Sequence, residues 1–196
     1  MKNKTTIAPN IFMVEDFFSI EECNKHIAFS QKNGFSEATI QTENGLIIDK
    51  SIRDNGRFSY DNYEFSEGLF ERMKEYLPET FFGIKLCGLN NRVHFYKYDI
   101  GQRFNWHMDG NYSPDAYSTS YFTFMVYLND DFEGGNTSLA HVETDDGEIN
   151  FEIEPKVGTA VFFQHKVLHR GDEVTKGVKY LMRSDVMYCS GLRGSA

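Results

Sequence analysis

The spacing of apolar residues along the chain changes near Gly83, from a helical period to an alternating one. Before that point, a first amphipathic helix is predicted over about 20–32. Ser19 and Glu22 have the spacing of a capping box, in which each side chain accepts a hydrogen bond from the other residue's backbone N–H. Gly34 is predicted to end this helix, because glycine readily adopts a positive φ angle.

A second amphipathic helix is predicted over about 64–77. Its apolar residues fall on one stripe, and Pro78 ends it because proline cannot continue a helix. Residues 38–48, between the two helices, are predicted as a short and partly polar extended stretch. The stripe of the second helix consists of Phe65, Leu69, Phe70, Met73 and Leu77.

After Gly83, apolar and polar residues alternate in short runs, which is the period of a half-buried β-strand. Turn residues such as Gly134-Gly135 and Asp130-Asp131 separate these runs. Many short strands with such turns are typical of a β-sandwich or barrel. The predicted strands cover 91–98, 103–107, 121–129, 136–141, 149–153, 158–165 and 178–188.

Composition and charge narrow the class of protein. Aromatic residues make up 15% of the 196-residue chain, which favours β structure and supplies a core for one domain. The net charge is -9 and no cluster of Lys or Arg stands out, so we expect no nucleic-acid partner. No apolar run reaches the length of a membrane-spanning helix, and Glu15 and Asp16 interrupt the N-terminal region. We therefore expect no membrane partner.

The three cysteines, Cys23, Cys87 and Cys189, are odd in number and form no CxxC motif. This pattern indicates neither a disulfide framework nor a zinc ribbon. A reducing compartment is the simplest expectation, and we predict a cytoplasmic location.

One histidine of the six stands in an HxD arrangement, His107-Met-Asp109. On a strand, residues two apart face the same side, so this imidazole and carboxylate would point into a common space. A second histidine from a distant strand would complete a 2-His-1-carboxylate set, the arrangement of non-haem iron(II) oxygenases. HxD alone is a weak signal, and a surface histidine beside a turn aspartate is the competing interpretation.

His165 and His169 compete for the position of the third ligand. Their spacing is that of a helical zinc pair, but Lys166 stands where the H-E-x-x-H motif has its glutamate. The run Val161–Phe163 before them reads as a strand and not as a helix. A zinc protease is therefore disfavoured, and both histidines remain candidates on this reasoning.

Five linked motifs in the second half of the chain carry a family resemblance. They lie in Asn91–Gly110, Tyr127–Thr137, Pro155–Phe163, His169–Gly171 and Gly177–Tyr188. In their order and spacing, over about 88–188, they resemble the prolyl-4-hydroxylase-like 2-oxoglutarate/Fe(II) dioxygenases. The resemblance implies a mainly β fold: a double-stranded β-helix, or jelly-roll barrel of the cupin-like kind, braced by N-terminal helices.

The resemblance also divides the single expected domain, residues 1–196. Residues 1–87 would form a helical and extended support, 88–188 the Fe(II)/2-oxoglutarate core, and 189–196 a tail. The implied activity is hydroxylation of a C–H bond of a peptide, prolyl residues included, or of a small molecule, with succinate and CO2 as co-products. The implied cofactors are Fe(II), 2-oxoglutarate and O2, with ascorbate as a further candidate.

Site residues follow from the same resemblance. His107, Asp109 and His169 would bind iron and form the catalytic centre, while Lys179 would pair with the C5 carboxylate of 2-oxoglutarate. A dianion deep in a barrel needs such a buried cation, because its desolvation would otherwise be prohibitive. The matched positions that line the cosubstrate pocket are Tyr98, Thr123 and Tyr127.

Substrate contacts are expected from residues that share a strand face with the pocket. Arg92 and Tyr96 have the parity of Tyr98, and Arg183 is a further anion partner unless it pairs structurally with Asp185. Two further segments are candidates for the mouth of the barrel. They are the run that holds Arg53, Asn55 and Arg57, and the loop 110–120, which is a candidate lid.

Two alternatives remain beside the hydroxylase. The first is a non-catalytic jelly-roll module that binds metal and 2-oxoglutarate, which Lys179 and Tyr127 make less favourable. The second is a cupin-type metalloenzyme without 2-oxoglutarate, which the order HxD, His, Lys disfavours. The net negative charge argues against a highly anionic substrate unless local charge overrides it.

Overall fold

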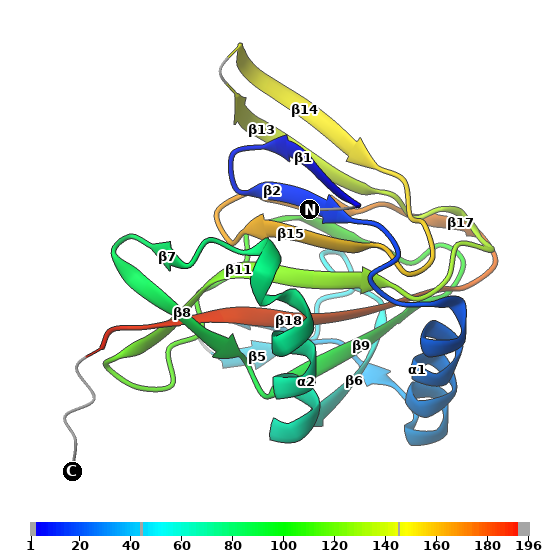
Figure 1. The fold of residues 1–196 in the computed structure, drawn as a ribbon. Helices are drawn as coiled ribbons and strands as arrows, with labels where there is room; N and C mark the ends of the chain where they lie inside the picture. The colour runs from blue at the N-terminus through cyan, green and yellow to red at the C-terminus, as the bar shows by residue number, and fades with distance from the viewer. Residues whose placement is uncertain (1–2, 44, 145, 192–196) are drawn as a thin grey trace.

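Two antiparallel β-sheets form the body of the computed structural model, which describes residues 3–43, 45–144 and 146–191 (Figure 1). The larger sheet has the strand order β1-β2-β15-β11-β18-β9-β6-β3, with β8 beside β18 and β7 beside β8. The smaller sheet has the order β10-β16-β13-β14, and the pairs β12-β17 and β4-β5 stand apart. This is the double-stranded β-helix that the sequence resemblance implied.

The strands of the larger sheet are β1 Lys4–Ala8, β2 Ile11–Val14, β3 Ser36–Glu37, β6 Gly56–Asp61, β7 Thr80–Phe81, β8 Ile84–Leu89, β9 Arg92–Tyr98, β11 Ser118–Tyr127, β15 Ala160–Gln164 and β18 Lys179–Cys189. Those of the smaller sheet are β10 Phe104–His107, β13 Thr137–Thr144, β14 Gly147–Ile153 and β16 Leu168–Gly171. The remaining strands are β4 Ile40–Thr42, β5 Gly45–Ile47, β12 Glu133–Gly134 and β17 Val174–Lys176.

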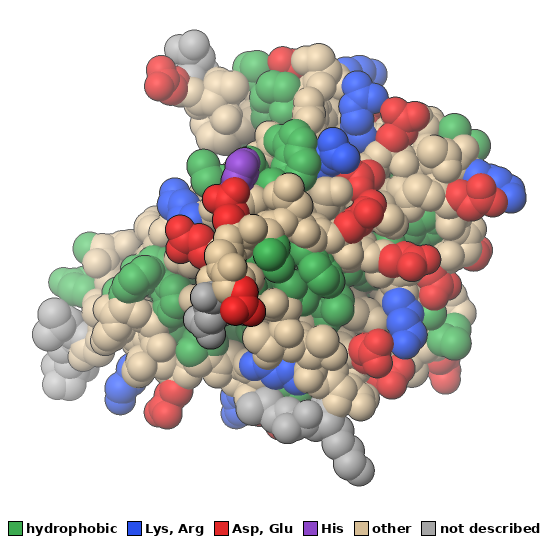
Figure 2. Space-filling model, turned by 90° about the horizontal axis from the view of Figure 1, so that it is seen from above, with side chains coloured by type: hydrophobic (Ala, Val, Ile, Leu, Met, Phe, Trp, Pro, Cys, Tyr) green, Lys and Arg blue, Asp and Glu red, His purple; other side chains and the backbone are tan. Residues whose placement is uncertain are grey.

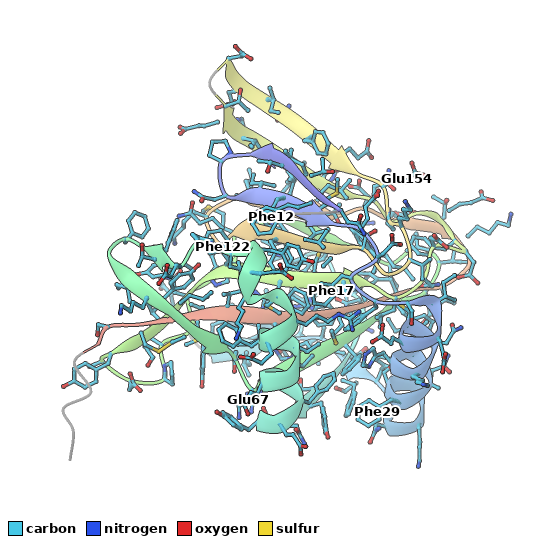
Figure 3. The ribbon with its side chains drawn as sticks, viewed as in Figure 1. Phe12, Phe17, Phe29, Glu67, Phe122 and Glu154 are labelled. Atoms are coloured by element: carbon cyan, nitrogen blue, oxygen red, sulfur yellow. A yellow bond between two sulfur atoms is a disulfide. The ribbon has the colours of Figure 1, made fainter. Side chains whose placement is uncertain are left out.

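Two helices, α1 Ile20–Asn33 and α2 Tyr63–Met73, cover one face of the larger sheet (Figure 1). The predicted capping box is present, since Glu22 N–H donates to Ser19 Oγ at 3.2 Å and Ser19 N–H donates to Glu22 Oε2 at 2.7 Å. A 3-10 turn, Lys74–Tyr76, completes the second helical segment. Figure 3 shows the core on this side of the sheet, with Phe12, Phe17 and Phe122 labelled.

The opposite face of the same strands points toward the smaller sheet. Register places Tyr98 opposite Lys179 and His94 opposite Arg183. On β11, Thr123 shares this face, while the alternate residues, such as Phe124, are fully buried on the helix side. The alternation in the sequence therefore separated an apolar packing face from a polar face, which fits the prediction.

The seven strands predicted between residues 91 and 188 are all present, with ends that differ by a few residues. Several strands were not predicted. β16 and β17, near the distal histidine, have four and three residues, too few to show an alternation. The others, β1, β2, β6 and β8, lie in the first half. Residues 1–87 therefore contribute strands to the larger sheet as well as helices. The predicted tail starts later than expected, because Cys189 still belongs to β18, and 192–196 lie outside the described residues.

The expectation that the cysteines form no disulfide is wrong, because Cys87 and Cys189 are bonded. They are separated by 102 residues, so no sequence motif links them. The antiparallel pairing of β8 with β18 brings them together, with Tyr188 opposite Leu86. Disulfides persist mainly in oxidising compartments, so this bond does not support the predicted cytoplasmic location. That location stays a prediction.

Removal of this disulfide by Cys189→Ser is expected to lower the free energy of unfolding by about 2–4 kcal/mol, because the crosslink closes a long loop of the unfolded chain. Urea denaturation would measure the change. Wild-type protein treated with a reducing agent should match the variant. Identical stability of the oxidised and reduced wild type would contradict the expectation.

The surface agrees with the acidic composition. Asp and Glu side chains are spread over the face shown in Figure 2, with Lys and Arg among them. None of the helices in the described ranges combines the length and the apolar character that crossing a membrane requires.

Candidate active site

Three side chains of the predicted metal set converge at one end of the space between the sheets. His107 ends β10, and Asp109 follows two residues later, just beyond the strand. His169 lies on β16, where the sheet register places it directly opposite His107. One ligand atom from each residue lies within 4.8 Å of the others. Of the two competing histidines, the structure brings His169, not His165, to the HxD pair.

The hydrogen bonds of the two imidazoles aim their Nε2 atoms at this common space. His107 Nδ1 donates to the carbonyl of Asn105 at 2.7 Å, and His169 Nδ1 donates to the carbonyl of Val167 at 2.9 Å. A carbonyl only accepts, so each Nδ1 carries the proton and each Nε2 keeps its lone pair. Those Nε2 atoms lie 3.9 and 3.8 Å from the Asp109 carboxylate oxygens.

The protonation states also suit a metal. Burial lowers the pKa of His107 to about 3 and lowers the pKa of His169, so both imidazoles are neutral near pH 7. Burial by itself would raise the pKa of the Asp109 carboxyl, but Arg183 and the two histidines hold it well below its usual range. Two neutral imidazoles and one carboxylate are the donor set of non-haem iron(II) sites, so the residues fit Fe(II).

Asp109 is held in place by three neighbours. Arg183 Nη2 lies 2.9 Å from its Oδ2 atom, the Thr123 hydroxyl donates to the same oxygen, and its N–H donates to the His165 carbonyl at 3.0 Å. His165 itself is buried between Thr123 and Ser120, with ring nitrogens 3.0 and 2.9 Å from their hydroxyls. His165 therefore supports a ligand instead of being one, as outer partners of metal sites commonly do.

A cavity of about 580 Å³ adjoins the three ligands and reaches Lys179 on β18. The Lys179 side chain is 1% exposed, and its Nζ donates to the Gly135 carbonyl at 2.5 Å. It forms no ion pair among the described residues, and its Nζ lies 5.5 and 5.4 Å from the ring centroids of Tyr98 and Tyr127. A buried cation beside a metal set is the complement that a dianionic 2-oxoglutarate requires, so the residues fit this cosubstrate.

Three residues were predicted to line the cosubstrate pocket, and the structure gives them different places. Tyr98 is buried and lines the cavity. Thr123 also lines it, but its hydroxyl is used by Asp109 and His165. Tyr127 lies behind the wall, where its hydroxyl donates to Thr137 at 2.7 Å, and it is Thr137 that faces the cavity.

Of the three residues predicted to contact the substrate, two line the cavity and one does not. Tyr96 and Arg183 line the cavity, and Arg183 pairs with both Asp109 and Asp185, at 2.9 and 3.0 Å. Arg92 does not line it, because its guanidinium reaches outward to Asp61 at 2.8 and 2.9 Å. Strand parity placed Arg92 on the cavity face, but it stands at the first residue of β9, beyond the cavity's end.

Of the two segments expected at the mouth of the barrel, one lines the cavity, through Arg53 and Arg57, and the other contributes little. The loop 110–120 folds back on the start of β11, where Tyr112 N–H donates to Ser120 Oγ at 2.8 Å, and only Gly110 of this loop lines the cavity. The hairpin β4-β5 lines it instead, through Ile40, Gln41 and Leu46. Its short and partly polar sequence gave no signal of this role.

Comparison with known proteins agrees with this geometry. Residues 93–184 match the family model of the 2OG-Fe(II) oxygenase superfamily. None of the curated protein sequences compared with the chain matches it significantly.

Solved structures share the fold at low sequence identity. The viral collagen prolyl hydroxylase of Paramecium Bursaria Chlorella virus-1, in its 2OG complex, has a TM-score of 0.63 and 21% identity over 92% of this chain and 97% of that chain. A prolyl hydroxylase of Trichoplax adhaerens, in complex with a peptide fragment of the hypoxia inducible factor oxygen degradation domain, has a TM-score of 0.69 and 14% identity over 92% and 83%. A Pseudomonas putida prolyl-4-hydroxylase has a TM-score of 0.61 and 17% identity over 90% and 92%.

The range that matches the 2OG-Fe(II) oxygenase superfamily, residues 93–184, contains the three ligands and Lys179.

The pH dependence of 2-oxoglutarate binding is expected to report on Lys179. Burial lowers the pKa of Lys179 to about 7, and the nearby Asp172 only partly offsets this shift. The charged form is the one that binds a dianion, and its share falls as pH rises above 7. The dissociation constant should stay constant below pH 7 and rise up to about tenfold per pH unit above it.

Anaerobic calorimetry of metal-loaded protein between pH 6 and 9 measures this dependence. Lys179→Arg should remove it, because a guanidinium keeps its charge over the whole range. A wild-type affinity that is flat up to pH 9 would contradict the assignment of Lys179.

Proposed function

We propose that the protein hydroxylates a C–H bond of a peptide or of a small molecule, releasing succinate and CO2. The observation that carries the proposal is the joint presence, in one cavity, of the His107, Asp109 and His169 set and the buried Lys179. When bound, iron(II) with 2-oxoglutarate and O2 supplies the oxidising power for such a reaction.

The chain's own residues would divide the work. The three ligands would hold the metal, and Lys179 with Tyr98 would hold the far carboxylate of the cosubstrate. Arg183 and the Thr123 hydroxyl fix the Asp109 carboxylate, so that one acidic group keeps its orientation and charge. The sheets and the aromatic wall around the cavity would keep bulk water from the reacting centre.

A peptide substrate, prolyl residues included, is one candidate, because the Trichoplax prolyl hydroxylase binds a peptide and shares the fold. A free small molecule is the other. Ascorbate is a further cofactor candidate, and adding it to the assay tests that directly.

Succinate release from 2-oxoglutarate by Fe(II)-loaded protein, with and without candidate substrates, tests the proposal. We expect slow uncoupled release without substrate and faster release with a true one. A non-catalytic binding module would bind 2-oxoglutarate and release no succinate under any condition. That result would contradict the hydroxylase proposal and favour the non-catalytic binding module.

A further inference from the structure

The cavity carries a positive charge that the metal and the cosubstrate do not explain. Among the described residues it is lined by four cationic side chains and by a single carboxylate, Asp109. The four are Arg53, Arg57, Lys179 and Arg183. The chain as a whole has a net charge of -9, so the cavity has the opposite sign to the protein that surrounds it.

Two of these cations already have partners. Arg183 pairs with Asp109 and with Asp185, at 2.9 and 3.0 Å. Lys179 is the cation that the proposed function assigns to 2-oxoglutarate. Arg53 and Arg57 remain, and neither forms an ion pair within the part of the chain that the structure describes.

Arg53 packs against two aromatic rings and has one hydrogen-bond donor without a partner among the described residues. Its side chain is buried, with 6% of the residue exposed, and its guanidinium lies 4.5 and 4.3 Å from the ring centroids of Tyr96 and Phe104. Its Nε donates to Asn55 Oδ1 at 2.7 Å, but its buried Nη2 has no hydrogen-bond partner. A buried N–H group without an acceptor is rare and costly, so Arg53, which lines the cavity, keeps hydrogen-bonding capacity that no residue of the described chain uses.

Arg57 approaches the same part of the cavity from β6. It stands opposite Tyr96 in the register, and its Nη2 donates to Thr39 Oγ1 at 2.8 Å. Burial lowers its pKa, and the neighbouring Arg53 and Arg92 act in the same direction. Two cations that repel each other at the wall of a cavity stabilise an anion placed between them.

His94 adds a neutral donor or acceptor to this wall. Its Nδ1 lies 2.9 Å from Ser59 Oγ, and its ring stacks on Tyr96. Burial lowers its pKa to about 3, and Arg183, Arg57 and Arg53 contribute to the shift, so it adds no charge near pH 7.

We infer that the primary substrate carries a carboxylate and that Arg53 and Arg57 bind it. The inference rests on the proposed hydroxylase function and narrows its substrate class. A carboxylate only accepts hydrogen bonds and matches the planar fork of a guanidinium. It is compact, as it must be in a cavity of about 580 Å³ that also has to hold the metal and 2-oxoglutarate. The sequence argued only against a highly anionic substrate unless local charge overrides the net acidity, and a single carboxylate is compatible with that expectation.

Matched acids and amides test the inference without knowledge of the true substrate. Zn(II)-substituted protein saturated with 2-oxoglutarate is redox-inert, so binding is measured without turnover. The probes are the N-acetyl amino acids and their carboxamides, with binding followed by ligand-observed NMR. Capped tripeptides with a central Asp or Glu, against Asn or Gln, separate a peptide source of the carboxylate from a free acid.

The variants are Arg53→Gln and Arg57→Gln, with Arg92→Gln as the matched control. We expect the acids that bind to do so at least about tenfold more tightly than their amides. Arg53→Gln should weaken that binding at least about 30-fold, as expected for loss of one partner of a buried charge pair, and the half-buried Arg57 about tenfold. Arg92→Gln should change nothing, because Arg92 pairs with Asp61 outside the cavity.

Calorimetry of 2-oxoglutarate on every variant shows whether the site is still folded, and Arg57→Gln covers the case in which Arg53→Gln fails to fold. Equal binding of acids and amides, a preference that survives both substitutions, or no binding of any probe would overturn the inference. If wild-type protein binds acids through Arg53 and Arg57 but does not bind 2-oxoglutarate, the proposed function fails and the carboxylate site stands.

Discussion

The Asp109→Ala variant is expected to lose the proposed hydroxylase activity, with substrate-dependent succinate release falling by at least about 100-fold. Loss of an outer partner of a metal site typically costs 10–100-fold, and loss of a direct ligand should cost at least as much. The two neutral imidazoles that remain would hold Fe(II) weakly, and the described lining of the cavity would have no carboxylate to balance its charge. Metal titration alongside the succinate assay separates lost metal from lost chemistry.

The fold is expected to survive this substitution. Arg183 loses one partner but keeps Asp185, whose Oδ1 atom lies 3.0 Å from its Nη2. Asp61→Ala is the matched control, since Asp61 is half-exposed and pairs only with Arg92 in the described chain. Undiminished succinate release by Asp109→Ala would remove Asp109 from the metal set.

The Lys179→Met variant is expected to bind 2-oxoglutarate at least about 100-fold more weakly in the metal-loaded state. Truncating one partner of a buried charge pair costs about 2–5 kcal/mol, because the other charge is left in a medium of low polarity. Tyr98 and Tyr127 flank the site but supply no charge, so neither can replace the lysine. Anaerobic calorimetry measures the change directly.

The free energy of unfolding of Lys179→Met is expected to rise or to stay unchanged, although its affinity for 2-oxoglutarate falls. An apolar side chain of similar length removes the desolvation penalty that lowers the pKa of Lys179 to about 7. Lys176→Met is the control, because that lysine is exposed and pairs with Glu133 at 2.6 Å. Unchanged 2-oxoglutarate affinity in a folded Lys179→Met protein would mean that another cation holds the cosubstrate.

Local patterns in the sequence were sufficient for the parts of this protein that depend on near neighbours. The capping box at Ser19 and Glu22 is made by residues three apart, and the structure contains it. The alternation of side chains predicted half-buried strands, because side chains two apart share a face whatever the strand pairs with, and the strands are present. The order and spacing of the motifs around His107, Asp109, His169 and Lys179 indicated the family.

Contacts between distant segments were decided only by the tertiary structure. The family resemblance already named His169 as the ligand, but spacing alone left His165 open. The physical choice depends on the register of β10 against β16, which neither strand's own sequence sets. The same holds for the Cys87–Cys189 disulfide, which needs β8 to lie beside β18.

The charge inside the cavity is a third feature that the tertiary structure decided, after the choice of histidine and the disulfide. Net charge is a sum over all residues, so it argued only against a highly anionic substrate and gave no information on the charge of the cavity. The sequence named the run with Arg53 and Arg57 only as a candidate for the mouth of the barrel. The packing of Arg53 on Tyr96 and Phe104, and the pairing of β6 with β9, bring their charge to the metal cavity. The sequence shows which charged residues the chain has. The fold determines which of them lie together in one cavity with few residues of opposite charge.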